Sequence, residues 1–373
     1  MTDKARPLKL LLSARDPAAA QAIGNLARQA STDSRFIIRV IASTPASELL
    51  KGLPCEFLAL PQDGTRNLEQ LNSVIIKVLE QFRPDAIIAG ASGPDAGVDE
   101  VLVKLSNGIR SYVVQDFWGD VNLSLDTAPD YYLVVDNIAA VLTQKRVDSK
   151  TYIVGSVKHA SYGSLNVTTL RAGWRVASGV REEETVIGYF GMPLGSVKGY
   201  WRTLEALVES IQGLPVTLVY RPHPKEDVHE RSRTCNILSS FEKFFEDQSD
   251  SVEETLAACD LILSCYSSCG IDSELLGRNL SQDDRLSVFL LYDAEVLEYY
   301  RHYTHLDDLP ISLLKRSLTI KDSSALRDTL DAYLPVESRI KFLASESRLP
   351  SAGDSVNRVL DKVFQDYYLS KSS

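Results

Sequence analysis

The sequence repeats one pattern along most of its length: a short, continuous apolar run is followed by a segment with apolar residues at helical spacing. Apolar runs bounded by turn-forming residues predict strands that are buried on both faces, which is typical of a parallel sheet. In the first half, the expected strands are residues 8–12, 36–41, 86–89, 112–115, 132–135 and 152–154. In the second half, they are residues 186–190, 216–220, 261–264 and 287–291.

The helices expected between these strands carry signals at their ends. An apolar stripe predicts a helix over 68–82, and Pro84 forbids its continuation. A second stripe predicts a helix over 197–211, which stops before Gly213. Strands alternating with helices in this way favour an α/β fold, and the length of 373 residues is enough for two domains. We therefore expect two Rossmann-like, doubly wound domains that face a cleft, with a polar linker at 158–184.

Composition narrows the class of protein. The chain carries 50 acidic and 40 basic side chains, a net charge of −10, so no nucleic-acid partner is expected. No apolar run reaches the roughly 18 to 20 residues of a membrane span, although peripheral membrane association stays open. The N-terminal residues lack the features of a secretory signal, and the five cysteines form no C-x-x-C pair. These features predict a cytoplasmic protein whose oligomeric state is not determined by its sequence.

A short Arg-Pro-His-Pro motif at 221–224 follows the expected strand 216–220. Ligands of open parallel sheets bind at the carboxyl ends of the strands, where this motif lies. Arg221 and His223 are donors suited to a phosphate, and the two prolines stiffen the loop that presents them. The alternative is that the His-Pro step is only a turn.

A Ser-Ser step follows the expected strand 261–264 in the same half of the chain. Ser267 and Ser268 offer hydroxyl groups, and the helix after them offers unpaired backbone N–H groups and the positive end of its dipole. Asp272 and Glu274 are then placed to accept hydrogen bonds from ribose hydroxyls. The alternative is a plain helix cap. Two such motifs in consecutive strand–helix units favour a shared site.

Gly191 follows the first strand of the second half, where we expect the backbone to approach a ligand or the other domain closely, or simply to turn. No G-x-G-x-x-G or G-x-x-x-x-G-K-[ST] sequence follows any strand, so neither a dinucleotide site nor an ATPase is expected. The sequence has no D-x-D triplet, and we expect no metal site and no cofactor beyond the substrate itself.

Three acids lie at expected strand ends in the first half. Asp95 and Asp99 lie in and just past the loop after strand 86–89, and Asp116 follows strand 112–115 beside Phe117 and Trp118. A carboxylate in this position is suited to removing a proton from a hydroxyl group. Aromatic neighbours desolvate a carboxylate and raise its basicity. The alternatives are helix capping for Asp95 or Asp99 and backbone bonding for Asp116.

With these motifs the chain resembles glycosyltransferases of the two-Rossmann, or GT-B, type. The layout matches over the whole length, and His223-Pro224 and Ser267-Ser268 are similar to the His-Pro and Ser-Ser motifs of bacterial sialyltransferases and capsule-building transferases. The resemblance implies metal-independent transfer from a CMP- or UDP-linked sugar donor to a glycan, lipid or protein acceptor in surface glycoconjugate synthesis. The acidic-acidic-Gly base motif of sialyltransferases has its nearest match at 62–64, Gln-Asp-Gly.

The same resemblance assigns roles to the two halves. Residues 1–165 would form the acceptor domain and residues 166–373 the nucleotide-sugar domain, with the final helix returning to the first domain. The Asp95 loop and the strand 186–190 also resemble nucleotide-sugar 2-epimerases, although a basic His-Arg-rich stretch of that family is absent. A polyol-phosphate transferase and a non-catalytic nucleotide-sugar binding subunit are further alternatives.

Overall fold

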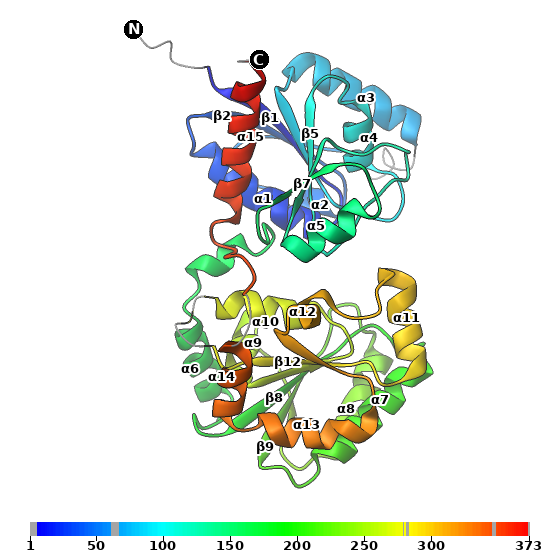
Figure 1. Cartoon of the computed structure of the whole chain (residues 1–373), viewed down its shortest axis with the longest axis vertical. Helices are drawn as coiled ribbons and strands as arrows, with labels where there is room; N and C mark the ends of the chain where they lie inside the picture. Colours follow the sequence, from blue (N-terminus) through cyan, green and yellow to red (C-terminus); the bar gives the residue numbers. More distant parts are fainter. Residues whose placement is uncertain (1–5, 61–66, 279, 281–282, 345–347, 372–373) are drawn as a thin grey trace. The chain divides into compact units, whose positions relative to one another are not determined.

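The computed structural model describes residues 6–60, 67–278, 280, 283–344 and 348–371. The chain forms two compact units (Figure 1). Unit 1 combines residues 1–164 with the C-terminal segment 349–373, and unit 2 comprises residues 165–348. None of the helices in the described ranges combines the length and the apolar character needed to cross a bilayer.

Within its described residues, unit 1 is built on a seven-stranded parallel sheet in the order β3-β2-β1-β4-β5-β6-β7. Because the order reverses beside β1, the carboxyl ends of β1 and β4 form the topological switch point of this sheet. The strands are β1 (Leu8–Ala14), β2 (Phe36–Ala42), β3 (Glu56–Ala59), β4 (Ala86–Gly90), β5 (Arg110–Val114), β6 (Tyr131–Val134) and β7 (Lys150–Ile153).

Local signals in the sequence explain the helices of unit 1. In α1 (Pro17–Ser31), Asp16 accepts a hydrogen bond from the backbone N of Ala19, and Pro17 occupies the first turn. Helix α3 (Leu68–Phe82) has the predicted bounds and ends at Arg83, whose φ of 51° is left-handed. The other helices are α2 (Ala46–Leu49), α4 (Val98–Leu105), α5 (Asn137–Gln144), a 3-10 turn at Ala160–Ser164, and α15 (Ser355–Lys371).

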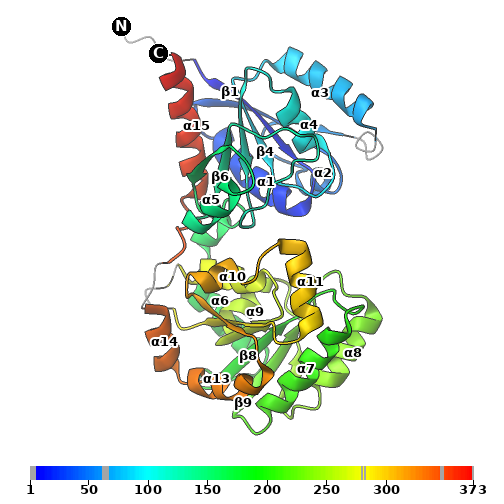
Figure 2. The same cartoon turned by 45° about the vertical axis from the view of Figure 1, so that its right-hand side comes forward.

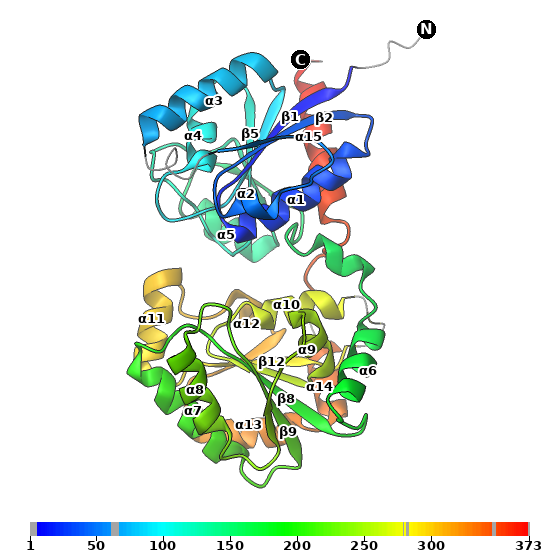
Figure 3. The ribbon, with the colours of Figure 1, turned by 180° about the vertical axis from the view of Figure 1, so that it is seen from behind.

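The C-terminal helix α15 belongs to unit 1. Its apolar face joins the core formed by α1, β1 and β2, and the views from both sides show it running beside these elements (Figures 1 and 3). The ring of Phe364 meets that of Phe36 edge to face, and the hydroxyl of Tyr112 on β5 donates to Asp366 at 2.8 Å. A helix from the end of the chain therefore completes the core of the first sheet.

Unit 2, in the part of the chain that the structure describes, contains a six-stranded parallel sheet in the order β10-β9-β8-β11-β12-β13. The strands are β8 (Thr185–Phe190), β9 (Val216–Arg221), β10 (Phe244–Glu246), β11 (Leu261–Ser264), β12 (Leu286–Leu290) and β13 (Ser317–Ile320). The order reverses beside β8, so its switch point lies at the carboxyl ends of β8 and β11.

Helices cover both faces of the second sheet. Helix α7 packs against α8, α11 and α13, whereas α9 packs against α6 and α10 (Figures 2 and 3). Their bounds are α6 (Val167–Ala177), α7 (Lys198–Ile211), α8 (Val228–Leu238), α9 (Val252–Ala258), α10 (Cys269–Gly277), α11 (Ala294–Thr304), α12 (Pro310–Leu313), α13 (Leu326–Tyr333) and α14 (Val336–Ala344), with a 3-10 turn at Ser323–Ala325. The two sheets thus confirm the predicted pair of Rossmann-like α/β domains.

The segment predicted as a polar linker, residues 158–184, contains the boundary between the two units, but most of it is folded into unit 2. The segment contains α6, whose Arg175 is buried in unit 2 and pairs with Asp260 at 2.9 Å. The same guanidinium also donates to the backbone carbonyls of Arg181, Glu182 and Glu184. The polar residues after α6 therefore wrap around a buried cation, because its N–H groups need acceptors away from water.

Candidate functional site

The strand order of unit 2 brings the predicted donor-site loops to one edge of the sheet. Strand β8 pairs with β9 on one side and with β11 on the other. Gly191 follows β8, His223 follows β9 and Ser267 follows β11, so the three loops leave neighbouring carboxyl ends. Between two of them, the backbone N of Tyr266 approaches the sulfur of Met192 at 3.4 Å. Parallel α/β sheets bind their ligands at this position.

The imidazole of His223 is held in one orientation. Its Nδ1 accepts a hydrogen bond from the backbone N of Lys225 at 3.0 Å, which requires an unprotonated Nδ1 and assigns the proton of the neutral ring to Nε2. Burial lowers the pKa of His223, and the nearby Lys225 lowers it further. At neutral pH the ring is therefore a neutral N–H donor through Nε2.

Arg221 is engaged in an ion pair, a contact that the sequence did not indicate. One terminal nitrogen of its guanidinium lies 2.6 Å from Asp247, directly after β10, and also donates to the carbonyl and hydroxyl oxygens of Ser249. The Asp247 carboxylate further accepts from the indole of Trp174 and the hydroxyl of Thr255. These donors hold the pKa of Asp247 below its ordinary value despite burial. Arg221 thus fixes the loop after β10. Its side chain remains 20% exposed.

The two serines differ in their surroundings. Ser267 is buried, and its hydroxyl accepts from the backbone N of Cys269 at 3.3 Å, so it acts as the side-chain cap at the start of α10. Ser268 is exposed, and its hydroxyl makes no cap hydrogen bond although the residue occupies the N-cap position. Ser268 therefore presents its hydroxyl at the surface of this edge.

Asp272 and Glu274, predicted to accept from ribose, are both buried inside α10. Glu274 forms a two-point ion pair with Arg316: one oxygen lies 3.0 Å from Nε and the other 2.8 Å from Nη2. The exposed fractions of the two side chains are only 3% and 1%. The carboxylate of Glu274 is thus committed to Arg316. Asp272 lies one helical turn after Ser268, and its proposed contact with a ribose stays a prediction.

The carboxyl edge of unit 1 holds the three acids predicted as bases, in different environments. Asp95 is exposed and pairs with Arg15 at 2.8 Å. Asp99 is buried, and its two oxygens accept from the hydroxyls of Ser13 at 2.6 Å and Ser92 at 2.8 Å. Because these serines end β1 and follow β4, Asp99 ties together the two strands of the switch point. Burial raises the pKa of Asp99.

Asp116 lies directly after Gln115 at the end of β5 and is half-buried. Burial raises its pKa; the positive charge of Lys158 opposes that rise and the negative charge of Asp16 adds to it. Nearby, burial and the charge of Asp116 raise the pKa of Asp120 to about 6. Asp116 therefore combines partial exposure with raised basicity, whereas Asp99 is buried and Asp95 is paired with Arg15.

Gln62-Asp63-Gly64, the nearest match to an acidic-acidic-Gly motif, lies outside the described residues. Within the described residues, no group of three or more His, Cys, Asp or Glu side chains is arranged to hold a metal ion.

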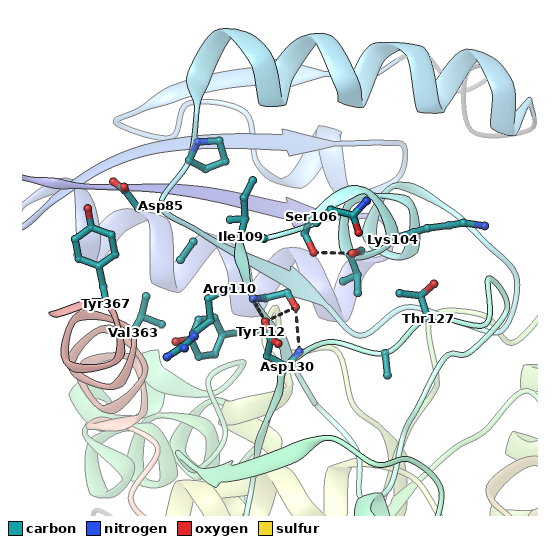
Figure 4. Close-up of a pocket in the computed structure, with 17 residues that line it drawn as sticks. Asp85, Lys104, Ser106, Ile109, Arg110, Tyr112, Thr127, Asp130, Val363 and Tyr367 are labelled. Carbon is teal, nitrogen blue, oxygen red and sulfur yellow. Dashed lines mark hydrogen bonds between the residues drawn. The ribbon is translucent and has the colours of Figure 1, made fainter. Parts of the chain in front are cut away.

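A hollow of about 680 Å³ lies at the opposite edge of the first sheet (Figure 4). It is lined by the amino-terminal ends of β4 and β5, including Asp85 and Arg110, and by Tyr367 of α15. Asp130 on its wall accepts from the backbone N and the hydroxyl of Ser111. None of the predicted site residues lines this hollow, so it is separate from the carboxyl-edge loops.

Sequence reasoning missed Glu226, which follows the His-Pro step in the loop after β9. It is half-buried, and its carboxylate accepts from the hydroxyl of Tyr220 and from the backbone N of His223, both at 2.7 Å. A β-carbon added to Gly191 would lie only 2.6 Å from this carboxylate. Gly191 therefore packs closely against Glu226, and its predicted approach to a ligand stays a prediction.

The comparisons with known proteins bear on the fold. No protein-family model matches the chain, and a search of curated proteins finds no match. Among solved structures, UDP-GlcNAc 2-epimerase from Neisseria meningitidis is similar with a TM-score of 0.67 at 12% identity, over 96% of this chain and 100% of that one. A glycosyltransferase from Rickettsia africae gives 0.64 at 11% identity over 98% and 99%. MurG from Acinetobacter baumannii gives 0.61 at 11% identity over 96% and 100%. The chain therefore has the GT-B type of fold, two Rossmann-like α/β domains, in common with these enzymes.

Proposed function

We propose that the chain is a glycosyltransferase that takes a sugar from a nucleotide-sugar donor in surface glycoconjugate synthesis. The observation that carries the proposal is the position of His223 and Ser268 on loops at neighbouring strand ends of one sheet, on either side of β8. The proposal assigns donor binding to unit 2 and acceptor activation to unit 1. We favour UDP as the nucleotide of the donor, because the similar epimerase is described as bound to UDP-GlcNAc. CMP is the alternative.

The proposed task of the donor site is to stabilise negative charge on the leaving nucleotide phosphate. His223 supplies a neutral N–H donor at Nε2, which needs no proton from solvent to act at neutral pH. Ser268 supplies an exposed hydroxyl, and the N-terminal end of α10 supplies the positive end of a helix dipole. Arg221 adds positive charge and holds the neighbouring loop through Asp247. No metal is required for this arrangement.

We assign the role of base to Asp116 in preference to Asp95 and Asp99. A general base must reach the hydroxyl that it deprotonates, and its pKa must lie nearer to the working pH than that of an ordinary carboxylate. Asp116 is partly exposed with a raised pKa. Asp99 uses both oxygens on buried serines, and Asp95 is paired with Arg15.

A second candidate is a nucleotide-sugar 2-epimerase, which needs no acceptor. It is favoured by the similarity to UDP-GlcNAc 2-epimerases, which also include a Listeria monocytogenes protein at a TM-score of 0.69 and 12% identity. At such identity the similarity supports the shared fold, and the two activities are separated by experiment.

The test is to incubate the purified chain with UDP-GlcNAc, other UDP-sugars and CMP-sialic acid, with and without glycan and lipid-linked acceptors. Proton NMR and mass spectrometry follow the sugar and the released nucleotide. The glycosyltransferase proposal expects nucleotide release that depends on an acceptor and a product heavier by one sugar. Conversion of the donor to its 2-epimer without an acceptor would contradict the glycosyltransferase proposal and support the epimerase. Transfer from a CDP-polyol, or tight binding without turnover, would instead favour a polyol-phosphate transferase or a binding subunit.

A further inference from the structure

We propose that Glu226 is a positioning residue that holds the His-Pro loop in its phosphate-binding conformation and couples it to the Gly191 loop. The inference rests on the proposed function, because it concerns the same nucleotide site. Glu226 does not touch the phosphate in this proposal; it acts through His223.

The first argument is the turn that Glu226 closes. Its backbone N donates to the carbonyl of His223 at 2.9 Å, and its side chain accepts from the backbone N of the same residue at 2.7 Å. Lys225, within the turn, donates its backbone N to Nδ1 of the imidazole. Both the main chain and the ring of His223 are thus fixed by residues 225 and 226. A histidine on a free loop would sample both tautomers and several rotamers.

The second argument is that tyrosine hydroxyls of β9 and α7 hold the carboxylate of Glu226 in place. The hydroxyl of Tyr220 on β9 donates to it at 2.7 Å, and the hydroxyl of Tyr200 on α7 lies 3.4 Å away. Tyr200 in turn interacts with the buried Tyr189 of β8, whose hydroxyl lies 3.9 Å from the sulfur of Cys265. Contacts between these buried side chains therefore connect the His-Pro loop, through Tyr189 of β8, to Cys265 at the start of the Ser-Ser loop.

The third argument is that the carboxylate of Glu226 packs against Gly191, which has no side chain. The two carboxylate oxygens lie 2.6 and 2.8 Å from the position that a β-carbon on Gly191 would take, so a side chain at residue 191 would displace this carboxylate. Glu226 is therefore packed between the loop after β8 and the loop after β9. A side chain that binds one loop and packs against the next keeps the spacing of the two loops constant.

The charge of Glu226 is compatible with an anion site nearby. Burial raises the pKa of Glu226, while the hydrogen bonds from Tyr220, His223 and Tyr200 lower it. The carboxylate is directed at these donors. A carboxylate satisfied in this way adds less repulsion at the surface than an unpaired one, because its charge is spread over several hydrogen bonds.

A matched control, Glu230, lies four positions along the chain on α8. Glu230 binds the backbone N of Gly195 at 2.8 Å, and a β-carbon on Gly195 would meet it at 2.1 Å, as Glu226 meets Gly191. Glu230 also forms the capping box of α8 with Asp227. Glu230→Ala removes a glycine contact and a helix cap without touching His223, whereas Glu226→Ala removes the contact with His223.

The experiment measures His223 directly in the full chain labelled with 15N-histidine, without ligand, and assigns its signals with His223→Gln. The wild type is expected to show an unprotonated Nδ1 and a protonated Nε2. Glu226→Ala is expected to give the averaged signals of an exposed imidazole, and Glu230→Ala those of the wild type. Glu226→Gln is expected to resemble the wild type, because its amide oxygen accepts from His223 and its NH₂ group donates to a tyrosine oxygen.

Calorimetry with UDP and CMP then measures binding to the same variants. Loss of a hydrogen bond to a charged group is expected to weaken binding about tenfold or more in Glu226→Ala, with less than about a threefold change in Glu226→Gln and Glu230→Ala. Unchanged His223 signals in Glu226→Ala, or an equal loss in Glu230→Ala, would overturn the positioning role. If the wild type shows the expected His223 signals but binds no nucleotide, the proposed function fails while the positioning of His223 stands.

Discussion

The ion pair between Glu274 and Arg316 leads to a quantitative prediction for Glu274→Ala. Both side chains are almost completely buried, and both carboxylate oxygens are used by the guanidinium. Removal of one partner leaves a charge in the interior without compensation, which costs about 3 to 5 kcal/mol. For a unit of this size, that corresponds to a decrease of about 10 °C in melting temperature. We expect the loss to be confined to unit 2.

A double variant distinguishes the cost of an unpaired buried charge from the cost of changing the packing at these two positions. Glu274→Leu with Arg316→Met replaces the two charges by apolar groups, which is often close to neutral for a buried pair. Arg316 also donates to the carbonyl of Leu343, and that acceptor is lost in the double variant. We therefore expect stability to return to within about 2 kcal/mol of the wild type.

Hydrogen–deuterium exchange of the full chain is the suitable assay, because peptides from β11 and β12 report on unit 2 and peptides from β1 and β4 report on unit 1. A loss below about 1 kcal/mol in Glu274→Ala would refute the structural role of the pair. Nucleotide affinity adds a second criterion. If Glu274 bound a ribose, the double variant would lose affinity even after its stability had recovered.

Two further predictions concern packing and titration. Gly270→Ala places a β-carbon 2.5 Å from the ring of Phe289, so urea unfolding should show a loss of about 1 to 3 kcal/mol; an unchanged midpoint would contradict this packing. Asp99→Asn tests the buried carboxyl, whose folded-state pKa burial raises above an unfolded value of about 3.9. The folded wild type then binds more protons than the unfolded chain above about pH 4, and stability falls as pH rises through the folded pKa. Unfolding free energies measured from pH 4 to pH 8 should fall less steeply in Asp99→Asn, and parallel curves would exclude this contribution.

Much of the fold is predictable because its strands are continuous apolar runs. The predicted 261–264 strand and the predicted 68–82 helix match the structure at both ends. Helix α8 escaped prediction because its exposed sequence, VHERSRTCNIL, has only a weak apolar stripe. Strands β3 and β13 lie at sheet edges and are short and partly exposed, so they lack the apolar runs of central strands.

The candidate site was predictable only as far as the strand ends. The sequence indicates strands β9 and β11, and the strand order of unit 2 places the residues after them, His223 and Ser268, at the same carboxyl edge of the sheet. The partners of the charged residues come from distant segments: Arg221 pairs with Asp247, 26 positions away, and Glu274 with Arg316, 42 positions away. No local pattern encodes such pairs, because they depend on how strands and helices pack in three dimensions.

The most direct test of the account is nucleotide binding by unit 2 of the full chain. Thermal unfolding is measured with UDP, CMP, CDP, GDP and UDP-GlcNAc, for the wild type, His223→Ala and His229→Ala. His229 is an exposed histidine of α8 and serves as the control. A ligand that binds only the folded state raises the midpoint by mass action. The account predicts a rise with one nucleotide class that persists in His229→Ala and disappears in His223→Ala. No rise with any nucleotide, or an equal rise in His223→Ala, would contradict it.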